Sequence, residues 1–451
     1  AITFTIKAAK EIKNRITIDV SQHFIGTNNS FAIEEVIKPF MKDVFGSDYD
    51  IDMDTNYNIK IKEFNEGISK IKSSKTLPSY ENKLKKNFIF ELAQYILENS
   101  EACQLYLKAK YFKLYIDEYQ DCDEEMNTFF MYLCEQLKIE TFIVGDEKQS
   151  IYIWRGAYPE AFTNIATKPN FSNIFMGNNY RSCQQIQNYS NLLYKETQEL
   201  YQPINNLDDI LLIHCNRENW GEIVSSYIKK DQSVALLRFS NENANIGADI
   251  LSQNGHPCTY IKTPPIFDIT TKVSWLYSAV AKFMILEHYS AYDLFFEIPS
   301  ESDNKKVHII DYKLKEIKDH SKNLIQFHGK FLSLAKYLNY ETIDDHVNKL
   351  YETINNEIYF PAFQVENYKN IAITFHSSKG LEFDQVIIFA DDYPLDIPGS
   401  ICNHYVASTR AKNKLLILYT DNSYQSKKYL ANLETLLLGK NLTPSLILKH
   451  I

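Results

Sequence analysis

The sequence predicts an α/β protein with parallel sheets and more than one domain. Two short apolar runs, at residues 114–116 and 142–144, each end in acidic residues. Farther along, strand-like apolar runs alternate with helical patterns over residues 210–261, which is typical of repeated βα units. A chain of 451 residues can form about two to four domains with separate cores, so we expect a multidomain α/β protein.

The composition is that of a globular protein with no membrane span. Hydrophobic residues make up 45% of the chain and charged residues 23%, and no apolar run approaches the length of a bilayer. The 7 cysteines are scattered without a C-x-x-C pair, which argues against zinc or a disulfide framework and indicates a cytoplasmic protein. The net charge of −9 excludes a global basic field, so nucleic acid would need a local basic groove with stacking aromatics.

The first domain is predicted to span residues 1–177. Residues 1–16 have the pattern of a strand followed by an amphipathic helix. Residues 40–108 are polar and mainly helical, which indicates an inserted subdomain. Within this insertion, one amphipathic helix is expected at 88–106, and it leads into the strand before Asp117.

The second domain is predicted to span residues 178–451. It opens with alternating strands and helices, and Gly255 stands where a helix C-cap is expected. Residues 268–362 are mainly helical and indicate a second insertion, after which the sheet resumes at 371–375. An amphipathic helix at 429–439 is expected to pack on the core.

The ends of the two acidic runs carry the strongest functional signal. A buried parallel strand that stops at charged side chains places them at the carboxyl edge of the sheet, where open α/β sheets bind ligands. Asp117 and Glu118 follow the first run, and GDEKQSIYIWRG follows the second. Together these segments resemble motifs II and III of superfamily-one helicases of the UvrD/Rep type.

Five other segments resemble further motifs of the same helicases. TFTIKAAKEIKNRI resembles motif Ia, and FIGTNNSF resembles motif Ib, although a Thr-Asn-Asn run before a helix is equally typical of an N-cap. NYRS resembles motif IV, HSSKGLEFDQVIIF motif V and NHYVASTRAKNKLLILY motif VI. The resemblance covers nearly the whole chain, and it implies two RecA-like domains that use ATP and Mg²⁺ and bind single-stranded DNA or DNA ends.

The resemblance also implies a role for each matching residue. Asp117 would hold Mg²⁺, Glu118 would activate the attacking water and Gln149 would sense the γ-phosphate. Arg181 would reach the γ-phosphate, and Arg410 would be the arginine finger. The rest of the nucleotide site would be formed by Tyr180, Gly380 and Glu382. The residues that would contact DNA are Thr3 (or Thr5), Phe4, Thr27, Tyr152, Trp154, Arg155, His376 and Ser377.

The sequence departs from the helicase pattern at two points. Ile6 stands where the family usually has Asn after TFT, which removes one polar contact. The P-loop, G-x-x-x-x-G-K-[ST], occurs nowhere in the 451 residues. It normally precedes motif Ia, with which this chain begins, so we expect it upstream of residue 1. Without a P-loop in the natural protein, a non-catalytic DNA-binding subunit becomes the better interpretation.

The residues around the motifs resemble one particular group of these helicases. FIGTNNSFAIEEVIKPFMKDVFGSDY and IDEYQDCDEEMNTFFMYLCEQLKIETFIVGDEKQSIYIWRGA resemble the helicase-like subunits of the bacterial Gabija anti-phage defence system. That resemblance implies a hetero-oligomer with the Gabija nuclease subunit, which has an OLD-family ATPase-like domain and a TOPRIM domain. The favoured hypothesis is a DNA-dependent ATPase of such a complex, and the alternative is a free-standing UvrD-like repair helicase.

Overall fold

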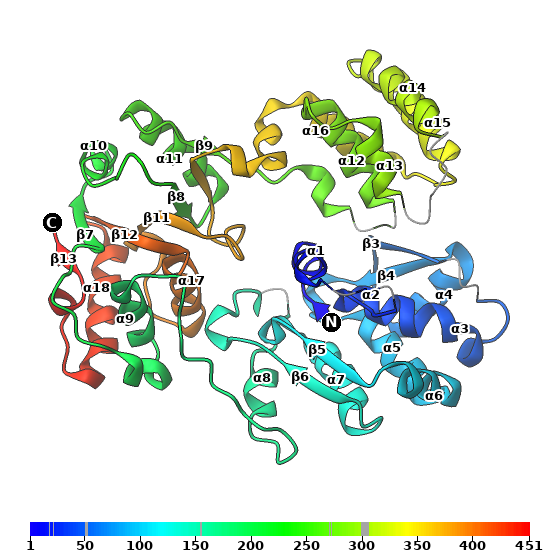
Figure 1. Cartoon of the computed structure of the whole chain (residues 1–451), viewed down its shortest axis with the longest axis horizontal. Coiled ribbons are helices and arrows are strands. Elements are labelled where there is room, and N and C mark those ends of the chain that lie inside the picture. Colours follow the sequence, from blue (N-terminus) through cyan, green and yellow to red (C-terminus); the bar gives the residue numbers. More distant parts are fainter. Residues whose placement is uncertain are drawn as a thin grey trace. The chain divides into compact units, whose positions relative to one another are not determined.

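The computed structural model describes residues 1–17, 19–20, 22–49, 53–153, 156–269, 271, 273–298 and 306–451. The chain folds as two compact units, Ala1–Met176 and Gly177–Ile451 (Figure 1). Each unit has its own parallel sheet with helices, so the predicted α/β class is confirmed. Among the described residues, no helix is both long and apolar enough to cross a membrane.

The main sheet of the first unit consists, within the described residues, of four short parallel strands in the order β2–β1–β5–β6. Ile2 of β1 is in register with Ile116 of β5, which is in register with Ile143 of β6. The carboxyl ends of these strands therefore lie at one edge of the sheet. The strand bounds are Ile2–Thr3 (β1), Gly26–Thr27 (β2), Lys113–Ile116 (β5) and Glu140–Ile143 (β6).

The helices of the first unit enclose a core rich in phenylalanine. Phe90 of α5 packs against Phe129 and Phe130 of α7, with ring centroids 5.5 Å and 5.8 Å apart. The sequence predicted one helix where α5 and α6 are separate, because Ser100 caps α6 by accepting a hydrogen bond from the Cys103 N–H. The bounds are Ile6–Arg15 (α1), Asn28–Ala32 (α2), Lys38–Phe45 (α3), Phe88–Asn99 (α5), Glu101–Lys110 (α6), Glu124–Glu135 (α7) and Glu160–Ile165 (α8), and a π-helical turn spans Ile33–Ile37.

The insertion of the first unit is not wholly helical, which corrects the prediction for residues 40–108. β3 (Asp54–Ile61) and β4 (Thr76–Tyr80) pair in parallel, and α4 (Phe64–Ser74) connects them. Ile61 is the one fully buried residue of β3. Tyr57, Ile59 and Ile61 alternate with the polar Asn58 and Lys60, which is the pattern of a half-buried strand, but the prediction of a mainly helical insertion overlooked it.

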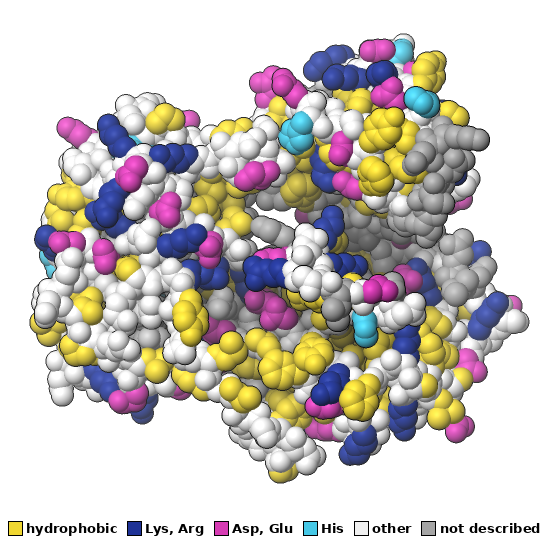
Figure 2. All heavy atoms as spheres, viewed as in Figure 1, with side chains coloured by type: hydrophobic (Ala, Val, Ile, Leu, Met, Phe, Trp, Pro, Cys, Tyr) yellow, Lys and Arg dark blue, Asp and Glu magenta, His cyan; other side chains and the backbone are white. Residues whose placement is uncertain are grey.

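One face of the first sheet is open to solvent at β5 and β6. Leu114 and Ile116 are buried, whereas Tyr115 is 51% exposed and Phe142 is 52% exposed. The rings of Tyr115 and Phe142 neighbour each other, with centroids 6.0 Å apart. Figure 2 shows hydrophobic side chains at the surface over this region. β5 is thus buried on one face only, and β6 is at most half-buried, whereas the sequence indicated buried strands.

The main sheet of the second unit has, in the part of the chain that is described, seven parallel strands in the order β13–β7–β12–β11–β8–β10–β9. β7, β8, β10, β11 and β12 each contain at least four consecutive buried residues, so both faces of the sheet are covered. The strand bounds are Ile210–Cys215 (β7), Val234–Arg238 (β8), Thr259–Tyr260 (β9), Asn370–Thr374 (β10), Phe383–Phe389 (β11), Ala411–Thr420 (β12) and Lys449–His450 (β13).

Helices flank this sheet and also form a separate cluster. Gly255, with φ +83°, follows the end of α11, as predicted for a helix C-cap. The helices near the sheet are α9 (Gln184–Leu192), α10 (Trp220–Ser225), α11 (Asn241–Gln253), α17 (Pro398–Ser408) and α18 (Tyr424–Leu437). The segment predicted as the second insertion contains α12 (Ser274–Ile285), α13 (Ala291–Glu297), α14 (Lys306–Asp319), α15 (Leu324–Tyr337) and α16 (Asp344–Asn355), which share their own apolar core.

Candidate active site

Asp117 and Glu118 lie directly beyond the carboxyl end of β5. The Asp117 N–H donates to the carbonyl oxygen of Ile2 at 3.0 Å, which extends the pairing of β5 with β1 by one residue. Glu118 then turns the chain in the left-handed conformation, with φ 54° and ψ 39°. A non-glycine residue in this conformation costs about 1–2 kcal/mol, and such strain is concentrated at functional sites.

Gln149 lies in the loop that follows the neighbouring strand, β6. The Val144 N–H donates to the carbonyl oxygen of Ile116 at 2.8 Å and carries the pairing past the end of β6. Asp146 then caps a short 3₁₀ turn, Glu147–Gln149, and its carboxylate accepts a hydrogen bond from the Gln149 amide at 3.0 Å. Lys148 Nζ is 2.6 Å from the same carboxylate. The fold therefore brings the two predicted acidic segments to adjacent positions at one sheet edge.

The donor set at the end of β5 fits Mg²⁺. Asp117 and Glu118 offer carboxylate oxygens, and Mg²⁺ is usually bound by one or two protein carboxylates together with substrate phosphates and water. No group of three or more His, Cys, Asp or Glu residues that could hold a metal occurs among the described residues. This donor set suits an ion that binds together with a phosphate ligand.

The predicted DNA contacts of the first unit differ in their exposure. Thr3 is buried, and its hydroxyl donates to the carbonyl oxygen of Thr5 at 2.9 Å, so the exposed Thr5 is better placed for a phosphate contact. Phe4 is half-buried against the core. Thr27 caps α2 by accepting from the Ser30 N–H, as the N-cap interpretation expects, and a phosphate contact stays a prediction.

The aromatic segment after motif III is described only in part. Tyr152 is half-buried, and its carbonyl oxygen accepts a hydrogen bond from the Ala157 N–H at 3.3 Å. Trp154 and Arg155 lie outside the described residues. The predicted contacts of all three residues with DNA stay predictions.

In the second unit, one carboxylate joins the segments that resemble motifs IV, V and VI. Glu382 Oε2 is 3.0 Å from Arg181 Nε, and Glu382 Oε1 is 2.8 Å from Lys412 Nζ. The hydrogen bond from Lys412, together with the positive charges of Lys412 and Arg181, lowers the pKa of Glu382. All three side chains are partly exposed, between 36% and 45%. Glu382 is thus a shared anionic partner for two cations.

The backbone explains why these segments meet. The Ser182 hydroxyl donates to the carbonyl oxygen of Ala411 at 2.7 Å, and the Cys183 N–H donates to that of Lys412 at 2.7 Å. The Phe383 N–H donates to the carbonyl oxygen of Arg410 at 2.9 Å. The segment after Arg181 and the start of β11 therefore both lie against the start of β12.

Arg410 is buried rather than displayed at the surface. Its side chain is 2% exposed, and its guanidinium donates to the carbonyl oxygens of Val406 at 3.0 Å and Leu381 at 3.1 Å. These bonds hold the end of α17 against the turn before β11. The role of Arg410 as arginine finger stays a prediction.

The other predicted residues of the second unit lie on exposed turns. Tyr180 is 93% exposed. Gly380 has φ +82°, and a Cβ there would meet no atom within 4 Å, so the backbone conformation rather than lack of space favours glycine. His376 and Ser377 follow β10; the His376 ring lies on Phe375 with centroids 3.8 Å apart, and Ser377 Oγ accepts from the Thr374 hydroxyl at 3.0 Å. Their roles stay predictions.

Sequence reasoning assigned no role to several residues at these sheet edges. Gln120 binds Glu118, and Lys412 binds Glu382. Both residues lie inside the segments that resemble helicase motifs, and this position is the sequence feature that could have indicated them. Arg238 and Asp392 form a largely buried pair, with Nε 2.7 Å from Oδ2, at the carboxyl ends of β8 and β11. Their positions at strand ends could have indicated them, but nothing in the sequence indicates that they pair.

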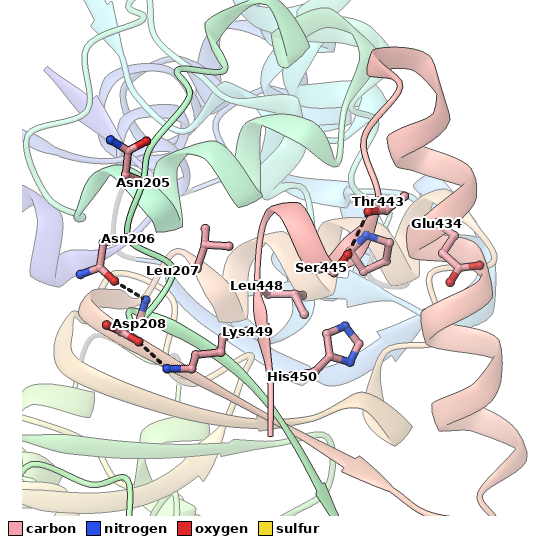
Figure 3. Close-up of a pocket in the computed structure, with 11 residues that line it drawn as sticks. Asn205, Asn206, Leu207, Asp208, Glu434, Thr443, Ser445, Leu448, Lys449 and His450 are labelled. Carbon is pink, nitrogen blue, oxygen red and sulfur yellow. Dashed lines mark hydrogen bonds and ion pairs between the residues drawn. The ribbon is translucent and has the colours of Figure 1, made fainter.

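A surface pocket of about 730 Å³ in the second unit is separate from these groups (Figure 3). Its walls come from the loop before β7, from α18 and from the turn that leads into β13, and Lys449 pairs with Asp208 at its rim. No predicted site residue lines it, and we assign it no role. The lining residues are Asn205, Asn206, Leu207, Asp208, Glu434, Thr443, Pro444, Ser445, Leu448, Lys449 and His450.

Two family models match the chain. The UvrD/REP helicase N-terminal domain matches residues 51–170, which include Asp117, Glu118 and Gln149. The viral superfamily 1 RNA helicase core domain matches residues 293–419, which include Glu382 and Arg410. With two parallel sheets whose carboxyl edges carry the motif residues, these matches define a UvrD-like helicase of superfamily one, built from two RecA-like domains with small insertions.

Comparison with individual proteins identifies relatives over most of the chain. The chain is 37% identical over 460 residues to Gabija protein GajB of Bacillus cereus (strain VD045), and the alignment covers 100% of this chain and 91% of that protein. It is 24% identical over 569 residues to the probable DNA helicase II homolog of Mycoplasma capricolum (94% of this chain, 78% of that protein). It is 25% identical over 337 residues to the ATP-dependent DNA helicase PcrA of Staphylococcus aureus (59% of this chain, 45% of that protein). The chain belongs to the GajB family of UvrD-like helicases.

Proposed function

We propose that this protein is the DNA-dependent ATPase subunit of a Gabija anti-phage defence complex. It binds single-stranded DNA or DNA ends in the cytoplasm and hydrolyses ATP to translocate or to signal to a partner nuclease. The observation that carries the proposal is the adjacency of Asp117–Glu118 and Asp146–Gln149 at one sheet edge. The alignment with GajB over the whole chain supports the assignment to this defence system.

The chemistry of ATP hydrolysis matches the residue types in the first unit. The reaction needs an oriented water and positive charge where the transition state spreads negative charge. Glu118 accepts the proton of the attacking water, and the Gln149 amide senses the γ-phosphate. Asp117 would hold Mg²⁺, and the ion would neutralise part of the phosphate charge there.

The cationic residues assigned to the phosphate charge belong to the second unit. Arg181 is 42% exposed and is held by an exposed ion pair with Glu382, which is weak enough for a phosphate to replace it. Arg410 acts as the second arginine, and its bond to the Leu381 carbonyl oxygen links it to the turn that carries Gly380. Tyr180, which is 93% exposed, stacks on the nucleotide base.

DNA binding uses aromatic rings and hydroxyl groups. Stacking of a base on an aromatic side chain contributes about 1–3 kcal/mol and tolerates any base. Tyr152 lies a few residues beyond Gln149 in the same loop. A base bound to Tyr152 and a phosphate bound to Gln149 would therefore both affect the conformation of this loop. The residues assigned to DNA are Phe4, Thr27, Tyr152, Trp154, Arg155, His376 and Ser377, with Thr5 in preference to Thr3.

One assay tests the proposal. ATP hydrolysis is measured with the full-length natural protein, alone, with single-stranded DNA and with DNA that has free ends. We expect turnover that DNA stimulates and that Glu118→Ala removes. No hydrolysis under any condition, or full hydrolysis in Glu118→Ala, would contradict the proposal.

Two alternatives to this proposal can be tested. The 24% identity to a probable DNA helicase II homolog favours a free-standing repair helicase, which would separate strands efficiently without any partner protein. The second alternative, a non-catalytic DNA-binding subunit, applies only if the full-length natural protein lacks a P-loop. In that case the full-length natural protein would bind single-stranded DNA but would not turn over ATP.

A further inference from the structure

Gln120 connects the two acidic segments of the first unit through both ends of its amide. The side-chain NH₂ donates to Glu118 Oε2 at 2.7 Å, and the side-chain oxygen accepts a hydrogen bond from the Asp146 N–H at 3.0 Å. The residue is 1% exposed, and its backbone carbonyl oxygen also accepts from the Ser150 hydroxyl at 3.2 Å. A buried amide held at both ends cannot rotate without breaking a bond.

The backbone at Gly145 provides independent evidence that the fold accommodates this amide. A Cβ at Gly145 would lie 2.9 Å from Gln120 Oε1 and 3.1 Å from the Phe162 ring. Glycine at this position therefore allows the Gln120 side chain to reach the backbone after β6.

The connection continues to the residue assigned to the γ-phosphate. The Asp146 backbone binds Gln120, while the Asp146 carboxylate accepts from the Gln149 amide at 3.0 Å. A path of hydrogen bonds thus runs from the Glu118 carboxylate through Gln120 and Asp146 to Gln149. All four residues lie within one compact unit.

We propose that Gln120 is a positioning residue that orients the Glu118 carboxylate and couples it to the loop after β6. This inference rests on the proposed function, in which Glu118 activates water. The amide NH₂ holds one oxygen of the carboxylate to which the proposed function assigns water activation. The amide oxygen follows the Asp146 backbone, so a shift of that loop on DNA binding moves Glu118. Gln120 therefore sets the turnover rate and its response to DNA, without contacting ATP.

Two substitutions separate the two halves of the amide. Gln120→Glu keeps an oxygen for the Asp146 N–H but replaces the amide donor with a carboxyl group that shares a proton with Glu118, whereas Gln120→Met removes both contacts. We expect Gln120→Glu to lower kcat about 10²-fold, with and without DNA, because a catalytic group displaced by about 1 Å loses roughly that much. Its ratio of DNA-stimulated to basal turnover should be retained. Gln120→Met should lower kcat similarly and also abolish the stimulation by DNA.

A matched control separates positioning from general damage. Gln104 of α6 also bridges two groups, donating to the carbonyl oxygen of Leu97 at 3.0 Å and to the Tyr132 hydroxyl at 3.4 Å. Gln104→Glu should leave kcat, KM and the DNA response unchanged. The KM for ATP should stay near the natural value in both Gln120 variants, because the side chain does not touch ATP.

The measurement is steady-state ATP hydrolysis by the full-length natural protein, with and without single-stranded DNA. Natural turnover in Gln120→Glu, or a fall in kcat matched by Gln104→Glu, would overturn the inference while the proposed function stands. A large rise in KM with kcat unchanged would also overturn it, because that pattern indicates a binding role. If the natural protein itself shows no turnover, the proposed function fails and the inference falls with it.

Discussion

The motif residues of the two units are held in different ways. In the first unit, Glu118 and Asp146 are connected by a buried amide with hydrogen bonds of 2.7 Å and 3.0 Å. In the second unit, Arg181 and Lys412 share the exposed carboxylate of Glu382. Exposed ion pairs contribute about 0–1 kcal/mol and are easily exchanged, whereas a buried bonded network is rigid. The acidic group is therefore preorganised, and the cations are free to change partner.

The largest effect should come from the exchangeable cation. Arg181→Ala should lower kcat for ATP about 10³–10⁵-fold, the usual contribution of an arginine that stabilises phosphoryl-transfer charge. Steady-state hydrolysis by the full-length natural protein measures it. Arg217→Ala, an exposed arginine of the same unit, should have no effect. Equal losses in the two variants would show that Arg181 acts only through general charge.

The rigidity of the first unit can be tested at Gly145. Gly145→Ala should lower the free energy of unfolding by about 1–3 kcal/mol, because the new Cβ overlaps Gln120 Oε1 and Phe162. Denaturant unfolding measures the change. Gly329→Ala in α15 is the control of opposite sign: its Cβ meets nothing within 4 Å, and alanine favours a helix by about 0.5–1 kcal/mol. A neutral Gly145→Ala would mean that the amide is not tightly held.

A buried histidine in the core of the second unit should make the free energy of unfolding depend on pH. His404 of α17 is fully buried and hydrogen-bonded to the Tyr189 hydroxyl at 2.6 Å, and burial lowers its pKa from 6.5 to about 3. Between pH values of about 3 and 6.5, the His404 side chain is neutral in the folded protein and protonated in the unfolded chain. The stability from His404 is therefore present at neutral pH and is lost as pH falls below 6.5, by about 1.4 kcal/mol per pH unit.

This dependence is measured by denaturant unfolding at pH 7.5, 6 and 5, pH values chosen to cross the upper part of that roughly 3–6.5 window. His404→Gln should flatten the slope of unfolding free energy against pH. His308→Gln, on the exposed side of α14, should leave it unchanged. Parallel slopes for the natural protein and His404→Gln would show that His404 does not titrate on unfolding.

The smallest change in stability is expected at Glu382. Glu382→Gln should alter the free energy of unfolding by less than about 1 kcal/mol, because its ion pairs are exposed. The KM for ATP should nevertheless rise, because Glu382 is one of the residues predicted to form the nucleotide site. Glu199→Gln, which removes the exposed pair with Lys440, should match the small stability change and leave KM alone. A large loss of stability at Glu382 would remove the contrast between the two units.

Much of this arrangement could be predicted, because the relevant signals are local in sequence. Apolar runs that end in Asp117 and in Asp146 predict adjacent strand ends, and the fold has them. The resemblance placed Arg181 and Glu382 in one nucleotide site, but the ion pairs of Glu382 with Arg181 and Lys412 could not be predicted, since they depend on strand order within the second sheet. β3 was missed because its alternating pattern, from Tyr57 to Ile61, is short and stands in a segment rich in charged and polar residues. The role of Gln120 was missed because a polar side chain gives no sign in the sequence that it is buried.

The left-handed backbone of Glu118 has a consequence for how this protein can evolve or be engineered. Glycine accepts φ 54° without the steric cost of about 1–2 kcal/mol that glutamate bears. Glu118→Gly would also leave the buried Gln120 NH₂ without its acceptor, which costs about 1–3 kcal/mol. Because the two effects are of similar size and opposite sign, stability alone does not keep glutamate at this codon. A screen for heat resistance should therefore tolerate Glu118→Gly, whereas selection for turnover, which needs the carboxylate assigned to water activation, should remove it.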